Sequence, residues 1–209
     1  MPSRWLKVPL ADYEGHMNAP QVAQLATLAH LFAQALAEHQ PESLAIVGIA
    51  GGNGLDHIDR NRTRRIVGLD VCQSYLDAAG ERYADLPGLE LHCADLAEID
   101  VRIEPVHMVH AALVFEHAGA GRCLDNALAL VKPGGAFVAV LQLPSESAAG
   151  VGPTGFDSLQ NLAPDFQLID PAWFTQAVTR RGLTLQSESR YPVASGKALW
   201  MGTFRSIVT

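Results

Sequence analysis

The chain has 209 residues, of which 48% are hydrophobic and 18% charged, so it can bury the core of one globular domain. Its net charge of −7, with no dense run of Lys and Arg, argues against nucleic acid or an anionic membrane surface as a partner. The chain shows no 18-residue apolar run, no signal-peptide pattern and no metal-ligand spacing among its three cysteines. We therefore expect a cytoplasmic protein without a metal.

The N-terminal region, residues 1–43, is predicted to be an arm followed by one amphipathic helix. The arm has no clear periodicity and carries Tyr13 and His16. Asn18 has the features of an N-cap, and apolar residues then recur at helical spacing as far as Glu38. This helix should pack on the core.

The stretch LAIVGIAGGNGLDHID, residues 44–59, is predicted to form a strand, a glycine-rich turn and the start of a helix at Leu55 to Ile58. Glycine lets a ligand approach the backbone, and a helix N-terminus offers N–H groups to an anionic or polar group. The pattern is not the G-x-G-x-x-G dinucleotide fingerprint, but it favours a nucleoside-bearing cofactor.

Two acidic residues follow the next two predicted strands. Arg65 to Asp70 is an apolar run that ends in an acid, at the place where a first βαβ unit can present a carboxylate to ribose hydroxyls. Alternatively, Asp70 caps the helix that begins near Gln73. A third strand over residues 89–93 is followed by Asp95, which could also cap a helix.

The second half of the chain continues the alternation of strands and helices. A fourth strand is predicted over residues 106–114, where His107 and His110 are expected to be packing residues. The remaining predictions are a helix over 121–131, a turn at 132–135, a strand over 136–141, a lid or substrate insertion over 145–169, a helix over 170–180 and a terminal pair of strands.

Four landmarks in this order resemble the class I S-adenosylmethionine-dependent methyltransferases: GIAGGNG at 48–54, Asp70, Ala94-Asp95-Leu96, and LVKPGGAFVAV at 130–140. The resemblance implies one α/β domain over residues 1–209. Its Rossmann-like, seven-stranded sheet should be mostly parallel, with helices on both faces and an antiparallel last strand. Ile46 and Val47 stand where the family often has an acid that engages the methionine amino group.

The same resemblance implies a set of cofactor-binding residues: Gly48, Ala50, Gly51, Gly52, Asn53, Asp70, Val71, Tyr75, Asp95, Leu96, Ala111 and Ala112. Asp95 would accept a hydrogen bond from the adenine amino group. His117, in FEHA, resembles the "L-x-H" segment of the family and is the first candidate for acceptor contact or general base. His16 and Tyr13 are further candidates, because the N-terminal chain of relatives often folds over the cofactor. The alternative is loop support or helix capping for His117, and a surface arm with ordinary polar residues for Tyr13 and His16.

The function implied by the resemblance is methyl transfer from S-adenosyl-L-methionine to a small-molecule acceptor, with a homodimer possible. No Asn-Pro-Pro-Tyr-like segment follows the fourth strand, which argues against exocyclic amino groups of bases as acceptors. Two other classes remain open. A nicotinamide-dependent oxidoreductase would share the loop and Asp70, and a non-catalytic S-adenosylmethionine-binding protein would fit the missing acid before Gly48.

Overall fold

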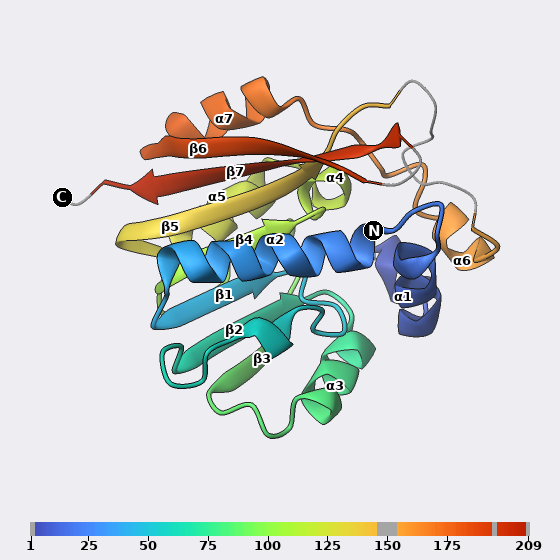
Figure 1. Cartoon of the computed structure of the whole chain (residues 1–209), viewed down its shortest axis with the longest axis horizontal. Coiled ribbons are helices and arrows are strands. Elements are labelled where there is room, and N and C mark those ends of the chain that lie inside the picture. The colour runs from blue at the N-terminus through green and yellow to red at the C-terminus, as the bar shows by residue number, and fades with distance from the viewer. Residues whose placement is uncertain (1–2, 146–153, 194–195, 208–209) are drawn as a thin grey trace.

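The computed structural model describes residues 3–145, 154–193 and 196–207. Its centre is a seven-stranded sheet in the order β3-β2-β1-β4-β5-β7-β6 (Figure 1). The strands are β1 Ser43–Val47, β2 Arg65–Asp70, β3 Leu89–Cys93, β4 Val106–Ala112, β5 Val131–Gln142, β6 Leu183–Pro192 and β7 Ala198–Ser206. β7 runs antiparallel to both of its neighbours, whereas the pairs among β1 to β5 are parallel. The predicted Rossmann-like sheet with an antiparallel last strand is confirmed.

Helices cover both faces of the sheet, as predicted. They are α1 Leu10–Asn18, α2 Gln24–His39, α3 Gln73–Arg82, α4 Phe115–Ala118, α5 Arg122–Ala129, α6 Asp157–Gln160 and α7 Pro171–Thr179, with 3-10 turns η1 Arg4–Lys7 and η2 Leu55–His57. Alternation along β1 sends Leu44 and Ile46 into the core beneath α2 and α3, and Ala45 and Val47 into the core beneath α5 and α7.

The N-terminal region differs from its prediction. The arm contains η1 and α1, and Asn18 is the last residue of α1 rather than the N-cap of the next helix. Pro20 accounts for this break, since a residue that precedes proline avoids the helical region and Ala19 accordingly has ψ of 138°. α2 begins only at Gln24.

The helix predicted after the glycine turn is reduced to η2, a single 3-10 turn. Ile58 is already extended, and the Asp59 carboxylate accepts a hydrogen bond from the Asn61 N–H at 2.9 Å, a local turn that competes with a continuing helix. Because no α-helix begins here, the expected contribution of a helix dipole to ligand binding is absent from this loop.

The predictions for the end of β4 and the start of β5 also differ from the structure. β4 ends at Ala112, two residues earlier than predicted, because Leu113 turns the chain with φ of +56°. The predicted turn at Lys132 to Gly135 is a bulge inside β5, where the partners of β4 move from Val131 to Ala136.

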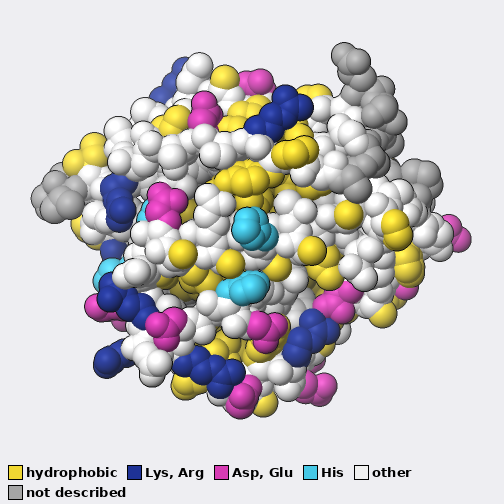
Figure 2. All heavy atoms as spheres, viewed as in Figure 1, with side chains coloured by type: hydrophobic (Ala, Val, Ile, Leu, Met, Phe, Trp, Pro, Cys, Tyr) yellow, Lys and Arg dark blue, Asp and Glu magenta, His cyan; other side chains and the backbone are white. Residues whose placement is uncertain are grey.

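Lys and Arg side chains are interspersed with Asp and Glu on the face shown in Figure 2. Within the described residues, no helix has the length and hydropathy needed to cross a bilayer.

Candidate cofactor and acceptor site

A cavity of about 960 Å³ lies at the carboxyl ends of the parallel strands, where open α/β sheets bind their ligands. It runs from Asp95, beyond β3, past Asp70 and Gly48 to Gln142 at the end of β5. Its volume is at the upper end of the range of small-molecule sites, about 300 to 1,000 Å³. The cavity therefore has room for a cofactor and a second ligand.

The glycine turn brings backbone close to this cavity. Gly48 has φ of +71°, and a Cβ there would lie 2.7 Å from Val114 Cγ2, so a side chain at this position would force the wall to shift. Two non-glycine residues that line the cavity, Ala50 and Leu113, are also left-handed, with φ of +47° and +56°. Left-handed conformations of non-glycine residues are strained, so they persist only where the surrounding structure holds them in place. They are found most often at ligand sites.

Asp70 is fixed at the cavity wall by two backbone groups. Its Oδ2 accepts from Ala50 N–H and its Oδ1 from Cys72 N–H, both at 2.9 Å. Burial raises the pKa of Asp70 above its ordinary value, and the bonds from Cys72 and Ala50 oppose that rise. The carboxylate is thus held rigidly beside the loop, and it also precedes α3. The bond from the Cys72 N–H lies at the N-cap residue of α3, in agreement with a local role, and the contact with ribose stays a prediction.

The predicted adenine-binding residues lie together at the other side of Asp70. Val71, Tyr75, Asp95 and Leu96 all line the cavity. Asp95 Oδ1 accepts from the Ala97 N–H at 2.9 Å in a local turn, and the second carboxylate oxygen adds hydrogen-bonding capacity at the wall. Residues 94–105 form no helix, so the alternative that Asp95 caps one is wrong.

A cap formed by η1, α1 and residues 156–166 covers the cavity. In Figure 1 α1 and α6 lie side by side at the end of the molecule that holds the N-terminus. Three polar contacts hold the cap: Arg4 Nε lies 2.8 Å from Asp165 Oδ2, Ser158 donates to Asp12 at 2.6 Å, and the Tyr75 hydroxyl donates to the Val8 carbonyl at 2.8 Å. The last of these ties the cap to α3.

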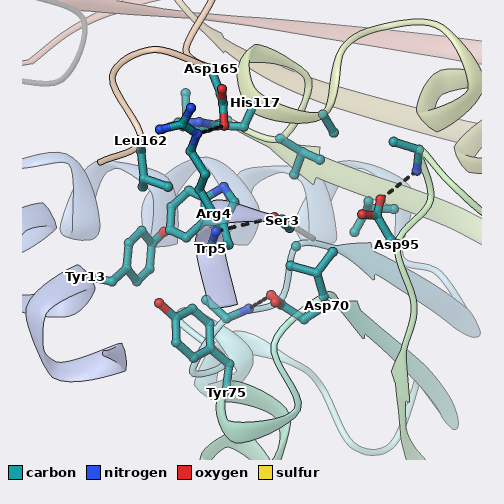
Figure 3. Close-up of a pocket in the computed structure, with 18 of the residues that line it drawn as sticks. Ser3, Arg4, Trp5, Tyr13, Asp70, Tyr75, Asp95, His117, Leu162 and Asp165 are labelled. Carbon is teal, nitrogen blue, oxygen red and sulfur yellow. Dashed lines mark hydrogen bonds and ion pairs between the residues drawn. The ribbon is translucent and has the colours of Figure 1, made fainter. Parts of the chain in front are cut away.

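His117 follows β4 in α4 and lines the cavity between two aromatic rings (Figure 3). Its ring centroid lies 5.0 Å from that of Trp5 and 5.2 Å from that of Phe166, both edge-on. Burial lowers the pKa of His117 to about 4, and within the described residues Nδ1 has no hydrogen-bond partner. The imidazole is therefore neutral at pH 7, and it is a weaker base than the ordinary histidine assumed from the sequence.

Tyr13 and His16 reach the same cavity from α1. Tyr13 stacks on Tyr75 with centroids 6.3 Å apart, and burial, followed by the nearby Asp70 charge, raises its pKa. His16 Nδ1 lies 2.6 Å from Thr154 Oγ1, and burial, followed by the charge of Lys197, lowers its pKa. Both groups are therefore uncharged at neutral pH.

Four residues of the expected cofactor set lie off this cavity. Ala111 is fully buried in the core beneath α5, and Gly52 packs against the Tyr83 ring. Gly51 and Asn53 line a separate hollow of about 50 Å³ beside the loop, where Asn53 donates to the Leu25 carbonyl at 2.9 Å.

Several cavity residues have no signal in the sequence. Trp5 and Phe166 come from segments without periodicity, and Gln24, predicted as helix interior, is the first residue of α2. They meet only through tertiary packing, so neither spacing nor composition could have placed them. Gln142, at the end of β5, also lines the cavity.

Of the two histidines of β4, His110 is a packing residue as expected, whereas His107 is exposed. His107 Nδ1 lies 2.8 Å from Ser43 Oγ at the opposite end of the sheet from the cavity. His110 is 4% exposed and packs edge-on against Phe32, with centroids 4.9 Å apart.

Residues 46–135 match a family model described as "Methyltransferase domain". No curated protein sequence matches the chain. Among solved structures, the N-methyltransferase NodS from Bradyrhizobium japonicum WM9, in complex with S-adenosyl-L-homocysteine, superimposes with a TM-score of 0.66 at 13% identity. The match covers 90% of this chain and 88% of NodS.

Two further structures share the fold. Magnesium protoporphyrin IX methyltransferase from Synechocystis PCC 6803, with bound S-adenosyl-L-homocysteine, gives a TM-score of 0.65 at 13% identity, covering 90% of this chain and 85% of that one. The [4+2]-cyclase SpnF gives 0.66 at 12% identity, with 85% and 80% covered. Likeness at this identity concerns the fold alone. The sheet order gives the chain the fold of the class I S-adenosylmethionine-dependent methyltransferases, and residues 46–135 match a methyltransferase domain.

Proposed function

We propose that the protein binds S-adenosyl-L-methionine and transfers its methyl group to a small-molecule acceptor. The observation that carries this proposal is the order of groups along one cavity. Asp95 and Asp70 lie beyond β3 and β2, the glycine turn follows β1, and His117, His16 and Gln142 surround the β4–β5 end. A cofactor laid along β3, β2 and β1 leaves the β4–β5 end to the acceptor.

In this chemistry the cofactor supplies an electrophilic methyl: its S–CH₃ bond breaks, the bond from the acceptor atom to carbon forms, and the acceptor proton leaves. The chain would contribute positioning and exclusion of water through the cap. His117 would contact the acceptor. Because burial lowers its pKa to about 4, we assign it orientation of the acceptor rather than strong base catalysis.

Titration calorimetry with S-adenosylmethionine and S-adenosylhomocysteine tests the cofactor. We expect saturable binding of both. If neither gives heat at millimolar concentration with folded protein, the proposal is wrong.

A screen of small hydroxyl, amine and carboxylate compounds, scored by formation of S-adenosylhomocysteine, then tests methyl transfer. NADH is the control ligand, because an oxidoreductase of the same topology would bind it instead.

A non-catalytic S-adenosylmethionine-binding protein remains the second candidate. It is favoured by Ile46 and Val47, which provide no acid for the methionine amino group. Tight cofactor binding without any transfer across the acceptor screen would support this candidate over methyl transfer.

A further inference from the structure

The small hollow beside the glycine turn adjoins the cofactor cavity. It has a volume of about 50 Å³, and Tyr13, Gly48 and Ala50 line both spaces. The Ala50 N–H also donates to Asp70 Oδ2 at 2.9 Å. A cofactor whose ribose reaches Asp70 therefore brings its amino-acid tail to this turn. In S-adenosylmethionine that tail ends in an ammonium and a carboxylate group.

The wall of the hollow is largely apolar, and it contains one carboxylate. Ile46 and Val47, at the end of β1, line it without a charge. Burial lowers the pKa of His110 to about 4, so this wall residue is neutral at pH 7. Among the described residues that line the hollow, Glu14 of α1 is the single acid and none is Lys or Arg. An ammonium group that loses its hydration there has Glu14 as its counter-charge.

Glu14 is held against the glycine turn by Arg82 of α3. Arg82 Nη1 donates to Glu14 Oε1 at 2.7 Å and to the Gly51 carbonyl at 2.8 Å, and Nη2 donates to Glu14 Oε2 at 3.2 Å. A Cβ at Gly51 would collide with Glu14 Oε1, so the carboxylate lies directly on the backbone of the turn. A carboxylate has about four lone-pair sites. Arg82 occupies two of them, and the others can accept from a ligand.

Arg82 does not cancel the negative charge around the turn. The hydrogen bond to Glu14 raises the pKa of Arg82, burial opposes this rise, and the charge of Asp56 adds to it, so one guanidinium serves two acids. Burial raises the pKa of Tyr13, and the charges of Asp70 and Glu14 raise it further. Tyr13 and Asp70 border the same cavity (Figure 3). The surroundings of the turn therefore favour a cation.

The basic side chains near the cofactor cavity face other groups. Lys7 lines that cavity but not the hollow. Burial lowers the pKa of His16, and the charge of Lys197 lowers it further, so the Lys197 ammonium acts on the acceptor side. Arg4 Nε lies 2.8 Å from Asp165 Oδ2. None of these cations lines the hollow in the part of the chain that the structure describes.

We propose that Glu14 binds the α-ammonium group of S-adenosylmethionine at the glycine turn. This inference rests on the proposed function for the identity of the cofactor. It accounts for the absence of an acid at Ile46 and Val47, because the carboxylate comes from the cap instead of from β1. The cap and the cofactor are then linked by a direct contact.

Four nucleosides that differ only in the 5′ substituent test this contact by calorimetry on the full chain. S-adenosylhomocysteine carries both charged groups, 5′-S-(3-aminopropyl)-5′-thioadenosine only the ammonium, 5′-S-(3-carboxypropyl)-5′-thioadenosine only the carboxylate, and 5′-S-butyl-5′-thioadenosine neither. We expect the aminopropyl compound to bind at least about tenfold more tightly than the butyl compound. Equal affinity for these two overturns the proposal. Failure of S-adenosylhomocysteine to bind counts instead against the proposed function.

Two variants place the preference on Glu14. Glu14→Gln should abolish the advantage of the aminopropyl compound and leave the affinity for the butyl compound unchanged. Glu14→Lys should reverse the preference in favour of the carboxypropyl compound, a gain that misfolding cannot produce. If Glu14→Gln keeps the advantage of the aminopropyl compound, or weakens the aminopropyl and butyl compounds equally, Glu14 only supports the cap and the proposal is wrong.

Asp12→Asn is the matched control. It removes a negative charge from the same helix, at a side chain that accepts from the Ser158 hydroxyl at 2.6 Å. The ratio of the affinities for the aminopropyl and butyl compounds should stay at its wild-type value. A loss of preference equal to that in Glu14→Gln would show that the charge of the whole cap sets the preference, and would overturn the assignment to Glu14.

Discussion

At the scale of single residues, Asp70 makes local hydrogen bonds and is predicted to bind the ribose of a cofactor. Its carboxylate is oriented by Ala50 and Cys72 before any ligand arrives, so hydrogen bonds to ribose hydroxyls would require little reorganisation. Asp70→Ala should weaken S-adenosylhomocysteine binding by roughly 10- to 100-fold, since a hydrogen bond to a charged group is worth about 1.5 to 3 kcal/mol. Asp59→Ala, which also removes a bond to a backbone N–H, is the calorimetric control. Equal affinity in the wild type and Asp70→Ala would reduce Asp70 to a cap.

His110 should make stability depend on pH. Burial lowers its pKa to about 4, so between about pH 4 and pH 6.5 the unfolded chain binds a proton that the folded chain does not. Stability from this group is full above pH 6.5 and is lost as pH falls. The free energy of unfolding of His110→Phe, relative to that of the wild type, should therefore increase by about 2 kcal/mol when the pH is lowered from 8 to 5. Urea unfolding at both pH values measures this difference. A difference between the two proteins that is the same at pH 8 and pH 5 would contradict this.

At the scale of elements, the cap should respond to the cofactor. η1 and α1 are held to the rest of the chain by Tyr75, by the part-buried bond between Ser158 and Asp12, and by the exposed ion pair between Arg4 and Asp165, which is worth less than about 1 kcal/mol. We expect S-adenosylhomocysteine to slow hydrogen exchange across residues 4–18, while α7, on a face away from the cavity, keeps its rate. Equal protection of both regions would indicate general stabilisation rather than closure.

The elements also show what sequence alone can predict. The apolar runs of β1 and β2 are bounded by glycine or acid, so the strands and the positions of Asp70 and Asp95 after them could be predicted from pattern. The arrangement of the sheet, with its antiparallel last strand, was implied by the resemblance. The short η2 and the break between α1 and α2 could not be predicted in this way. Single residues, Asp59 and Pro20, end the helix at these points although the surrounding sequence has helical periodicity. The acceptor end was least predictable: Trp5, Gln24 and Phe166 are brought together only by tertiary packing.

At the scale of the whole molecule, the three cysteines should differ in reactivity. Cys72 and Cys123 are buried, and burial raises the pKa of each to about 12, whereas Cys93 is exposed beside Asp95. A thiol reagent should therefore modify one cysteine per native chain rapidly and all three in denaturant. S-adenosylhomocysteine should slow the native reaction, because Cys93 lies at the adenine side; rapid modification of two or three native thiols would contradict the fold here.

β7, the last strand in sequence, lies inside the sheet between β5 and β6. A chain that has not yet added residues 198–206 holds β5 with an open edge, and β6 then has no hydrogen-bonding neighbour at all. An open, apolar edge is a template for pairing with other chains. β5 is buried from Gly135 onward except for that edge. The order of synthesis thus leaves this apolar edge unprotected until β7 is made, and a nonsense mutation before Ala198 should yield insoluble protein rather than a smaller folded protein.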